Sequence, residues 1–450
     1  MDRTIEDFVR GLALDAYLVG GAVRDELLGL ESKDADFVVP GVDYDGLRRA
    51  LQPHGRVEDL EVAGRMVGAR LYPRDEQVRA AAPAGIEFAP PRAERSTGPG
   101  RHDFEIVADP ALSIEDDMAR RDFTVNAIAR RLETDDLVDP FGGEADLKRG
   151  VLRTVGPRSF AEDPLRIVRG LRLVSQLGLT PDATTLQQMR DEADSVRLVS
   201  GERVGGGLHA DGLGELSKLL LGAHPAQALR LARDTGVLTV LLPELAPAIG
   251  FEQDSKRQHL PLDEHSFEVV QAAADTGAGL AVRLGALLHD AGKPGADGDH
   301  AERGARLADD ALARLRYPTR LRSYVTRLVR AHAFPLEDVD ELFARRFLRE
   351  HGDQLAFDLV AHKEADLRGK HVSQAELDAA ARLRGLLEQE RVQPHRLEDL
   401  AIDGSDLLQI GYSEGPGLGR ALDSLLDAVV EDPALNTRDA LLERARDLVE

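Results

Sequence analysis

Strand-like segments occur in the first 150 residues of this 450-residue chain and almost vanish from about residue 161 onward. The apolar runs "AYLVGG" (16–21) and "DADFVV" (34–39), each bounded by turn residues, predict short buried strands. Two further strands are predicted at 64–72 and 85–89, and residues 21–29 have helical spacing. Beyond residue 161, amphipathic Leu- and Ala-rich stretches follow one another between glycine-rich breaks. This pattern predicts an α+β fold, in which a small mixed-sheet head precedes a long, mainly helical body.

Composition narrows the function classes. A chain of this length is expected to form several domains. It contains no Cys, so disulfides and thiolate metal sites are excluded, and any bound metal must use His and carboxylate ligands. The first residues lack the basic start and apolar core of a signal peptide, and no apolar run approaches membrane-spanning length. We therefore expect a cytoplasmic protein with no membrane partner.

The formal net charge of −23 opposes binding to nucleic acid unless basic residues are concentrated on one face. The basic residues are unevenly spread along the chain. Six arginines fall within residues 149–172: Arg149, Arg153, Arg158, Arg166, Arg169 and Arg172. A strongly acidic, solvated exterior accounts for the total charge, and this arginine-rich segment is the candidate exception.

Two alternating aspartates, Asp34 and Asp36, stand at the start of the second predicted strand. On an extended segment both side chains project from the same side, where their charges repel unless a divalent cation neutralises them. Mg²⁺ prefers oxygen ligands and leaves coordination positions open for substrate phosphates. Glu87, in the middle of another predicted strand, is the candidate third acid. Taken alone, an Asp-x-Asp pair is also common in solvated loops.

Gly20 and Gly21 lie between the first predicted strand and the helical stretch that follows. Paired glycines let backbone N–H groups approach phosphate oxygens, and Arg24, one turn later, could reach the same phosphates. The alternative is a simple strand-to-helix turn. The combination of glycines, arginine and paired aspartates is more specific than any part of it.

A third candidate group has a spacing of three residues. On a helix, Asp163, Arg166 and Arg169 share roughly one face. A carboxylate and a guanidinium together can hydrogen-bond the Watson–Crick edges of C or A. Without other evidence, the same spacing is explained by salt bridges on the helix surface.

Four segments in order resemble the polymerase-β-like nucleotidyltransferases, and more narrowly the bacterial class II CCA-adding enzymes and poly(A) polymerases. "GGAVRD" followed by "KDADFVV" resembles their active-site signature, and "IEDDMARRDFTVNAIA" (114–129) their ribose-recognition motif. "DPFGGEADL" (139–147) resembles the hinge motif, and "EDPLRIVRGLR" (162–172) the nucleobase-selecting motif. The glycine-rich segment at 204–214 departs from the family pattern.

This resemblance implies phosphoryl transfer with Mg²⁺, tRNA as the RNA substrate, and CTP and ATP as the nucleotides. Asp34, Asp36 and Glu87 would be the catalytic acids, the first two as metal ligands. The implied nucleotide-binding residues are Gly20, Gly21, Arg24, Arg121, Asp122, Asn126, Asp163, Arg166, Arg169 and Arg172. A polar loop is expected at residues 90–103. The polar segment "RAERSTGPGRHDFE" (92–105) falls where relatives have a flexible, charged element needed to switch from C to A.

A second constellation lies between residues 259 and 366. It resembles the HD phosphohydrolase superfamily, most specifically at "ALLHDAGKP" (286–294). His and Asp together suit a divalent metal, whereas an isolated histidine is more often a satisfied surface or core residue. His265, His289, Asp290 and Asp366 match the minimal pattern, and His300 and His332 would permit a second metal.

The expected division is a nucleotidyltransferase head (1–148), a helical neck with the nucleobase-selecting motif (149–250), an HD domain (251–370) and a helical tail (371–450). In the tail, "GPGLG" (415–419) predicts a turn between helices and "NTRDALLERA" (436–445) a capped helix. The predicted function is CCA addition to the tRNA 3′ end, with HD phosphohydrolase activity on RNA ends. The alternatives are a CC-adding, A-adding or poly(A) polymerase of this family, or an HD phosphohydrolase with an inactive head.

Overall fold

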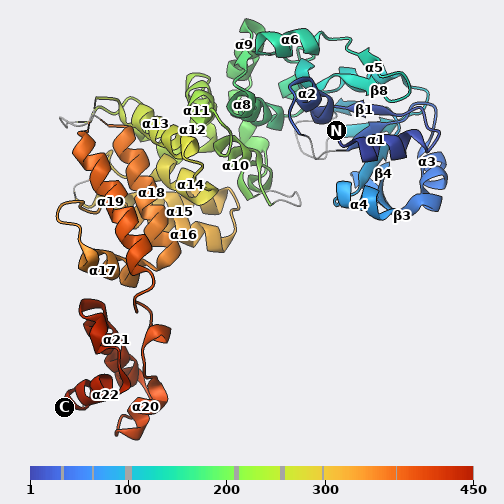
Figure 1. Ribbon diagram of the computed structural model, residues 1–450. Helices are drawn as coiled ribbons and strands as arrows, with labels where there is room; N and C mark the ends of the chain where they lie inside the picture. Colours follow the sequence, from blue (N-terminus) through green and yellow to red (C-terminus); the bar gives the residue numbers. More distant parts are fainter. Residues whose placement is uncertain are drawn as a thin grey trace. The chain divides into compact units, whose positions relative to one another are not determined.

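The computed structural model describes residues 1–31, 35–62, 65–96, 104–206, 212–253, 259–295, 298–370 and 372–448. The chain divides into two compact units, Met1–Pro243 and Glu244–Glu450. The first contains the sheet and the second is built from helices, as the ribbon in Figure 1 shows. None of the described helices is both long and apolar enough to cross a membrane. The predicted α+β architecture is confirmed.

A seven-stranded mixed sheet, in the order β3-β4-β5-β2-β1-β8-β9, forms the centre of the first unit. Its strands are β1 (Tyr17–Val19), β2 (Asp36–Val38), β3 (Gly55–Val62), β4 (Arg65–Pro73), β5 (Ile86–Ala89), β8 (Ala129–Arg131) and β9 (Leu137–Val138). The four strands predicted from the sequence are therefore confirmed. Strand β2 is parallel to β5, and the other pairs in the sheet are antiparallel.

The pairing of β2 with β5 positions two of the predicted acids. Asp36 is the register partner of Glu87, and Phe37 is the partner of Phe88. The two buried phenylalanine rings stack with centroids 5.5 Å apart and fix this register, because a slip of either strand by one residue would turn its ring to the opposite face. Asp36 and Glu87 are thereby placed side by side on the other face of the sheet.

Helices accompany the sheet, and four of them begin at a side-chain cap. They are α1 (Arg3–Arg10), α2 (Gly21–Leu27), α3 (Tyr44–Leu51), α4 (Glu76–Ala81), α5 (Ile114–Ala119) and α6 (Gly143–Arg149). Asp43 caps α3 by accepting a hydrogen bond from Gly46, and Ser113 forms a capping box with Asp116 at α5. The helix predicted after Gly20 is α2.

The segment at 90–103, predicted as a loop, is partly extended. β6 (Arg92–Ser96) pairs antiparallel with β7 (Phe104–Ala108) as a separate two-stranded sheet. The loop prediction is wrong for residues 92–96, because cross-strand hydrogen bonding can stabilise polar strands that carry no apolar alternation. The remaining part of the predicted loop, from residue 97 to residue 103, lies outside the described residues.

The rest of the first unit is helical except for β10 (Val151–Leu152), which pairs with β11 (Thr180–Pro181). Among the described residues, β11 is the only strand after residue 161, as the sequence predicts. The helices are α7 (Ser159–Glu162), α8 (Leu165–Leu177), α9 (Ala183–Asp191), α10 (Glu215–Leu220), α11 (Pro225–Asp234) and α12 (Val237–Leu241). Asp163 does not lie on a helix, contrary to the spacing argument: it is an extended residue just before Pro164, which begins the turn into α8.

The second unit contains a bundle of helices (Figure 1), and the predicted histidines lie at or near the ends of these helices. Its helices are α13 (Leu262–Asp275), α14 (Leu280–Leu288), α15 (His300–Arg314), α16 (Thr319–Ala331), α17 (Glu341–His351), α18 (Asp353–Arg368) and α19 (Gln374–Glu390). His265 lies in α13 and Asp366 in α18, whereas His289 and His332 directly follow α14 and α16.

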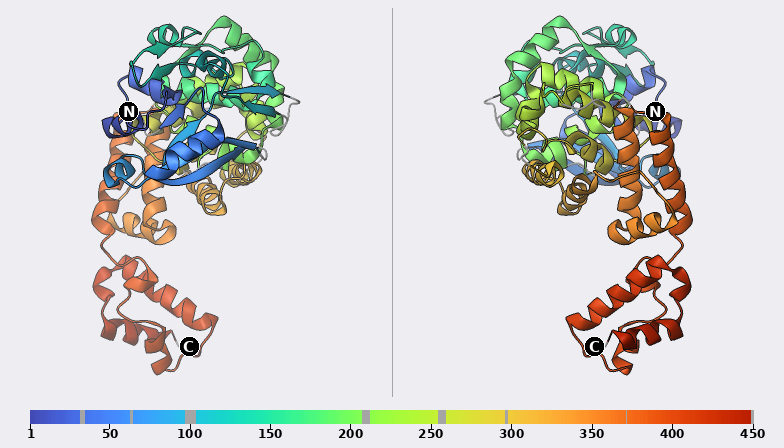
Figure 2. Two further views of the ribbon diagram at one scale, coloured as in Figure 1. Left: turned by 90° about the vertical axis from the view of Figure 1, so that its right-hand side faces the viewer. Right: turned by 90° about the vertical axis from the view of Figure 1, so that its left-hand side faces the viewer.

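Three helices at the C-terminal end, red in Figure 2, pack around a small core of their own. They are α20 (Gly404–Gln409), α21 (Pro416–Glu431) and α22 (Arg438–Asp447). The capped helix is confirmed, since Thr437 accepts a hydrogen bond from Ala440 N at the start of α22. The turn predicted at 415–419 is wrong, because Pro416 stands at the first position of α21, where its missing N–H has no partner to lose.

Candidate functional site

A cavity of about 640 Å³ in the first unit brings together the residues predicted for the nucleotide site. Its walls come from the sheet, from α2, from the segment after α5 and from α8. Its lining includes Gly20, Gly21, Arg24, Asp36, Glu87, Arg121, Asp122, Asn126, Asp163, Arg166, Arg169 and Arg172. Asp34, the other predicted metal ligand, lies outside the described residues.

Two carboxylates mark the sheet side of the cavity. Asp36 is exposed and its register partner Glu87 is partly exposed. Arg70, on the neighbouring strand β4, donates from Nε to Glu87 Oε1 at 3.1 Å. Sequence analysis missed Arg70. Asp36 and Glu87 are oxygen donors of the kind that hard divalent cations prefer, and Arg70 offsets part of their charge.

The glycine pair lies against two arginines. Gly20 has φ of +74°, and a Cβ there would lie 2.5 Å from Arg121 Nη1, so only glycine fits without displacing that guanidinium. Arg24 is 8% exposed and is held from two sides. Its Nη1 donates to Asn126 Oδ1 at 2.7 Å, and its Nε donates to Asp25 Oδ1 at 2.8 Å. Arg24 is therefore fixed in the cavity wall before any ligand arrives.

Asp122 links this arginine to the base end of the cavity. Its Oδ1 accepts a hydrogen bond from Asn126 Nδ2 at 3.0 Å, and its Oδ2 lies 2.9 Å from Arg169 Nη2. Burial alone would raise the pKa of Asp122, but the Arg169 guanidinium and the hydrogen bond from Asn126 outweigh burial and hold the pKa below its usual value. A continuous polar chain thus runs from Arg24 through Asn126 and Asp122 to Arg169.

A buried aspartate that sequence analysis did not single out holds two arginines of the cavity. Asp117, on α5, accepts from Arg120 Nη2 at 2.7 Å and from Arg121 Nη2 at 3.1 Å. Burial would raise the pKa of Asp117, but the two guanidinium groups outweigh burial and hold this pKa below its usual value. The sequence "DDMARR" (116–121) contains the signal, since an acid three and four residues before two arginines places all three on one helical face.

The base end contains Asp163 and the arginines of α8. Arg166 donates to the backbone oxygen of Arg120 at 2.8 Å and to Ser159 Oγ at 3.2 Å, so it is part of the wall and not a surface ion pair. Asp163 Oδ2 accepts from Arg203 Nη2 at 3.2 Å. Arg203 precedes the glycine-rich segment that departs from the family pattern, and the sequence offered no basis for pairing it with Asp163.

Arg172 completes this group. Its Nε donates to Glu215 Oε2 at 2.6 Å, and Glu215 begins α10 after the glycine-rich segment. Glu215 was also missed from the sequence. The partners of Asp163 and Arg172 therefore lie on the two sides of that segment, 40 and 43 residues further along the chain.

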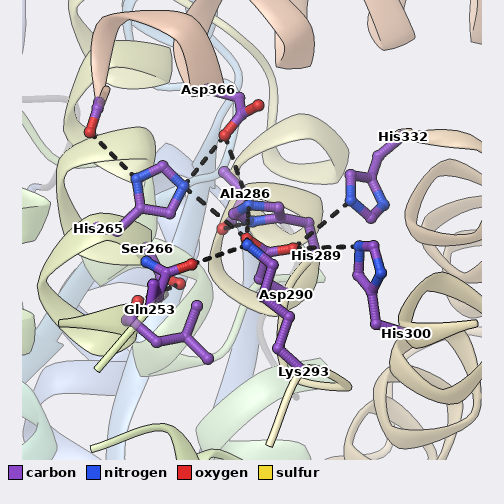
Figure 3. A network of polar contacts seen from close by, with 12 residues as sticks. Gln253, His265, Ser266, Ala286, His289, Asp290, Lys293, His300, His332 and Asp366 are labelled. Carbon is purple, nitrogen blue, oxygen red and sulfur yellow. Dashed lines mark hydrogen bonds and ion pairs between the residues drawn. The ribbon is translucent and has the colours of Figure 1, made fainter. Parts of the chain in front are cut away.

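The second unit holds a separate cluster of imidazoles and carboxylates, shown close up in Figure 3. Every predicted member is present: His265, His289, Asp290, His300, His332 and Asp366. His265 Nε2 lies 3.1 Å from Asp366 Oδ1, and His289 Nε2 lies 3.0 Å from Asp290 Oδ2. On the other side of Asp290, its Oδ1 lies 3.7 Å from His300 Nε2 and 3.6 Å from His332 Nε2. Asp290 therefore joins two groups, His265–His289–Asp290 and Asp290–His300–His332, each close enough to hold one metal ion.

Backbone carbonyls orient three of these imidazoles. Nδ1 of His289 bonds to Ala286 O at 2.9 Å, Nδ1 of His332 to Val329 O at 2.7 Å, and Nδ1 of His265 to Gly369 O at 3.1 Å. Because a carbonyl can only accept, each Nδ1 carries a proton, and each Nε2 faces the carboxylates of the cluster as the atom available to a metal ion. Buried His289 Nε2 has no hydrogen-bond partner among the described residues. These donors fit a divalent cation.

Lysines flank the two aspartates. Lys293 Nζ lies 2.6 Å from Asp290 Oδ2, and Lys370 Nζ donates to Asp366 Oδ2 at 2.6 Å. Burial would raise the pKa values of both aspartates, but the facing histidines and these ammonium groups hold the values well below the usual range. Burial lowers the pKa of His289, so its ring is neutral, as a metal ligand must be.

A fifth histidine of this cluster was missed. His362 is fully buried, and its ring centroid lies 5.0 Å from that of His289 and 5.8 Å from that of His332. The sequence contains a signal that would have found it: "HKEAD" (362–366) places His362 one helical turn before the predicted ligand Asp366.

Three family models match consecutive parts of the chain. "Poly A polymerase head domain" matches residues 16–153, and "Probable RNA and SrmB- binding site of polymerase A" matches residues 178–249. A model for tRNA nucleotidyltransferase domain 2 matches residues 304–445.

Similar proteins span most of the chain. The multifunctional CCA protein of Xanthomonas campestris pv. campestris (strain B100) is 34% identical over 438 residues, covering 92% of this chain and 97% of its own length. The corresponding protein of Azoarcus sp. (strain BH72) is 38% identical and covers 70% of this chain and 73% of its own. The crystal structure of the Bacillus stearothermophilus CCA-adding enzyme in complex with CTP is 23% identical, with a TM-score of 0.71 over 99% of this chain and 96% of that one. This last likeness concerns the fold.

Proposed function

The chain belongs to the family of the multifunctional CCA proteins, and from this premise we propose that it adds C, C and A to the 3′ end of tRNA from CTP and ATP without a nucleic acid template. The observation that carries the proposal is the single cavity that gathers the acids, the glycine pair and the α8 arginines. The enzyme is thus a nucleotidyltransferase, and its partners are the tRNA 3′ end, CTP and ATP.

The acids of β2 and β5 would hold the metal ions. Asp34 and Asp36 are the proposed ligands, with Glu87 as the third acid, and Mg²⁺ is the proposed ion because it prefers oxygen donors. When bound, such ions activate the 3′-hydroxyl and neutralise the departing pyrophosphate. The pairing of Asp36 with Glu87 across parallel strands supports this role, since it sets both carboxylates beside each other without a local motif.

The phosphate end would be formed by Gly20, Gly21 and Arg24. The absence of side chains at the two glycines allows phosphate oxygens to approach the backbone, and Arg24 supplies positive charge. Because Asp25 and Asn126 already hold the Arg24 guanidinium, it does not have to be ordered when the triphosphate binds. Arg121, Asp122 and Asn126 would then shape the wall beside the ribose.

The base end would select C and A by hydrogen bonding. Both bases present an exocyclic amine next to a ring nitrogen acceptor, so a carboxylate that accepts and a guanidinium that donates can read both. Asp163 and Arg166 are the proposed pair, with Arg169 and Arg172 holding the surrounding wall. Arg203 and Arg120 O keep the pair in place through their own hydrogen bonds. U and G present a carbonyl where C and A present the amine, and Asp163 would repel it.

The test uses purified protein with tRNA ending before the CCA, after the first C and after CC. CTP and ATP are offered singly and together with Mg²⁺, and product lengths are read on a gel. The expected result is a complete CCA end, lost in the Asp36→Ala variant. Addition that stops at CC, or only A joined to a CC end, would instead favour a specialised CC- or A-adding enzyme, and long A tails would favour a poly(A) polymerase.

The cluster in the second unit supports a second activity, phosphohydrolysis at RNA ends by an HD site. The supporting observation is the set of imidazoles around Asp290, with His289 Nε2 facing the Asp290 and Asp366 carboxylates. His265, His289, Asp290 and Asp366 would hold one divalent metal, with His300 and His332 available for a second. Such a metal supplies a nucleophilic hydroxide and stabilises charge on a phosphoryl oxygen. Lys293 and Lys370 would bind the phosphate when the metal ion coordinates Asp290 and Asp366, the aspartates that these lysines contact.

The test of this activity is release of phosphate from RNA ends and opening of cyclic phosphate ends, with different divalent metals added to metal-free protein. The His289→Ala variant is expected to lose the activity and to keep CCA addition. Turnover that persists in this variant would contradict the assignment. We also retain, as proposals, the division into head, neck, HD domain and tail at residues 148, 250 and 370, and a cytoplasmic location.

A further inference from the structure

His362 lies in the middle of α18 and has no hydrogen-bond partner for either ring nitrogen among the described residues. Its side chain is fully buried. An imidazole has one donor and one acceptor nitrogen when neutral, and leaving a buried polar group unsatisfied is unfavourable. A ring with two such atoms therefore lacks a partner, which the described part of the chain does not supply.

Other buried histidines of the same unit show how unusual this is. His265, His289 and His332 each place Nδ1 on a backbone carbonyl. His395, 1% exposed, is satisfied at both nitrogens, by Gln393 O at 2.7 Å and by Asp353 Oδ1 at 2.8 Å. His395 is a histidine held by packing and hydrogen bonds alone, and it provides the matched control for His362.

The position of His362 connects it to the metal-binding groups. The ring centroids of His289, His332 and His362 form a triangle with sides of 5.0, 5.2 and 5.8 Å. Imidazoles that share one ion at metal–nitrogen distances of about 2.0–2.1 Å have ring centres roughly 5 Å apart. His362 also stands four residues before Asp366, so both project from one face of α18, the spacing by which a helix offers two ligands to one ion.

Packing against His289 and His332 explains the burial of His362 but leaves both of its nitrogens without hydrogen-bond partners among the described residues.

We propose that His362 is a further ligand of a divalent metal ion bound in the histidine–aspartate cluster. The inference rests on the metal site put forward above as part of the proposed function. It extends that site to a residue outside the HD pattern, supplied by the helix that also carries Asp366. One of the two unsatisfied ring nitrogens acquires its partner when the ion binds.

Metal affinity tests the proposal directly. All proteins carry Asp34→Ala and Asp36→Ala, so that metal binding in the head does not contribute. Co²⁺ is titrated into metal-free protein with His362 intact, with His362→Gln and with His395→Gln, and binding is followed by visible absorption and by metal analysis. We expect His362→Gln to weaken one ion by about 10- to 100-fold. His395→Gln should keep the affinity, and its thermal midpoint reports the cost of a purely structural substitution.

The absence of cysteine from the chain permits a second readout. In His362→Cys the only thiol of the protein stands at the proposed ligand position. A thiolate bound to Co²⁺ gives a sulfur-to-metal charge-transfer band in the near ultraviolet, which reports coordination even if the Gln variant folds poorly. His395→Cys, the control, should give no such band.

The outcomes separate this inference from the function on which it rests. If the protein with His362 intact binds no Co²⁺ in the cluster, the proposed metal site itself fails. If that protein binds Co²⁺ and His362→Gln binds it with the same affinity and stoichiometry, the metal site stands and His362 is a packing residue only. Weaker binding by His362→Gln together with the charge-transfer band in His362→Cys supports the proposal.

Discussion

The nucleotide cavity of the first unit and the histidine–aspartate cluster of the second are both polar, but their charges are arranged in opposite ways. In the cavity, arginines dominate the wall and nearly every one is held by a carboxylate of the chain. These ion pairs include Arg24–Asp25, Arg121–Asp117, Arg169–Asp122, Arg172–Glu215 and Arg203–Asp163. In the cluster, imidazoles surround two aspartates, and neither ring nitrogen of buried His362 has a hydrogen-bond partner among the described residues.

This difference reflects what each region is built to receive. A wall of fixed guanidinium groups is ready for a phosphate-bearing nucleotide, because its donors are oriented before the ligand arrives. A buried set of lone pairs is ready for a cation, which compensates the burial of the aspartates and imidazoles together. The arginine-lined cavity also answers the objection raised by the net charge of −23, since basic groups are concentrated at the proposed site of the nucleotide.

The largest expected effect comes from removing an acid of the head, which should impair the reaction of the first region and not that of the second. Asp36→Ala should lower CCA addition about 10³-fold, because a metal ligand supplies several kcal/mol of transition-state stabilisation. Phosphohydrolysis at the cluster should not change. Gel assays of tRNA extension and phosphate release measure both activities, with Asp45→Ala, an exposed acid of α3, as the control. Near-normal tRNA extension by the Asp36→Ala variant would show that this acid is not needed for CCA addition.

The reciprocal substitution should affect the cluster alone. His289→Ala is expected to lower phosphohydrolysis on the order of 10²-fold through weaker metal binding, while CCA addition stays at its original rate. His259→Ala, an exposed histidine of the same unit, is the control. Loss of both activities in His289→Ala, with the protein still folded, would contradict the assignment of one reaction to each region.

A smaller effect should distinguish base selection from packing. Arg166→Ala is expected to lower kcat/KM about 10- to 100-fold for both CTP and ATP, as for the loss of one good base contact. The preference over UTP should fall with it. Steady-state kinetics with all four nucleotides measure this ratio, and Arg190→Ala on α9 is an exposed control. A uniform loss with an unchanged CTP-to-UTP ratio would assign Arg166 to the wall only.

The smallest effect concerns pH. In metal-free protein, His289 and His362 have lower pKa values folded than unfolded, so the unfolded chain binds more protons below about pH 6.5. The free energy of unfolding of the second unit should therefore fall with falling pH, by at most about 1.4 kcal/mol per pH unit for each histidine. The carboxylates Asp117 and Asp122, whose pKa values are lowered, stabilise the first unit above their unfolded value of 3.8 and lose this contribution only below it.

Hydrogen exchange of peptides from the two units, recorded with a chelator between pH 7 and pH 4, measures this difference. Protection around α14 and α18 should decrease first, after correction for the intrinsic pH dependence of exchange. In His362→Gln the decrease should be shallower, because one histidine no longer titrates. Equal loss in both units would show that the buried imidazoles do not govern acid sensitivity.

Much of the site could be predicted because local patterns carry it. The glycine pair, Asp36 and the His-Asp dipeptide at 289–290 combine residue types whose chemistry limits their use, and each lies within a short segment. The strands and helices around them follow from apolar periodicity and turn residues, which act over a few neighbours. The predicted loop at 92–96 and the predicted turn at 415–419 failed because strand pairing and a Pro at the first helical position overrode composition.

What the sequence by itself determined was therefore the position of four strands of the sheet, the mainly helical character of the chain after residue 161, the residue types available for chemistry and the two kinds of site. Only the tertiary structure decided which residues meet across long sequence separations. It sets Glu87 beside Asp36 through parallel strand pairing, Arg203 on Asp163, and His362 next to His289. Such pairings depend on packing between distant segments, because each is fixed only when the buried faces of those segments come together. Local spacing relates His362 to Asp366 on the same helix, but it does not show that His362 meets His289.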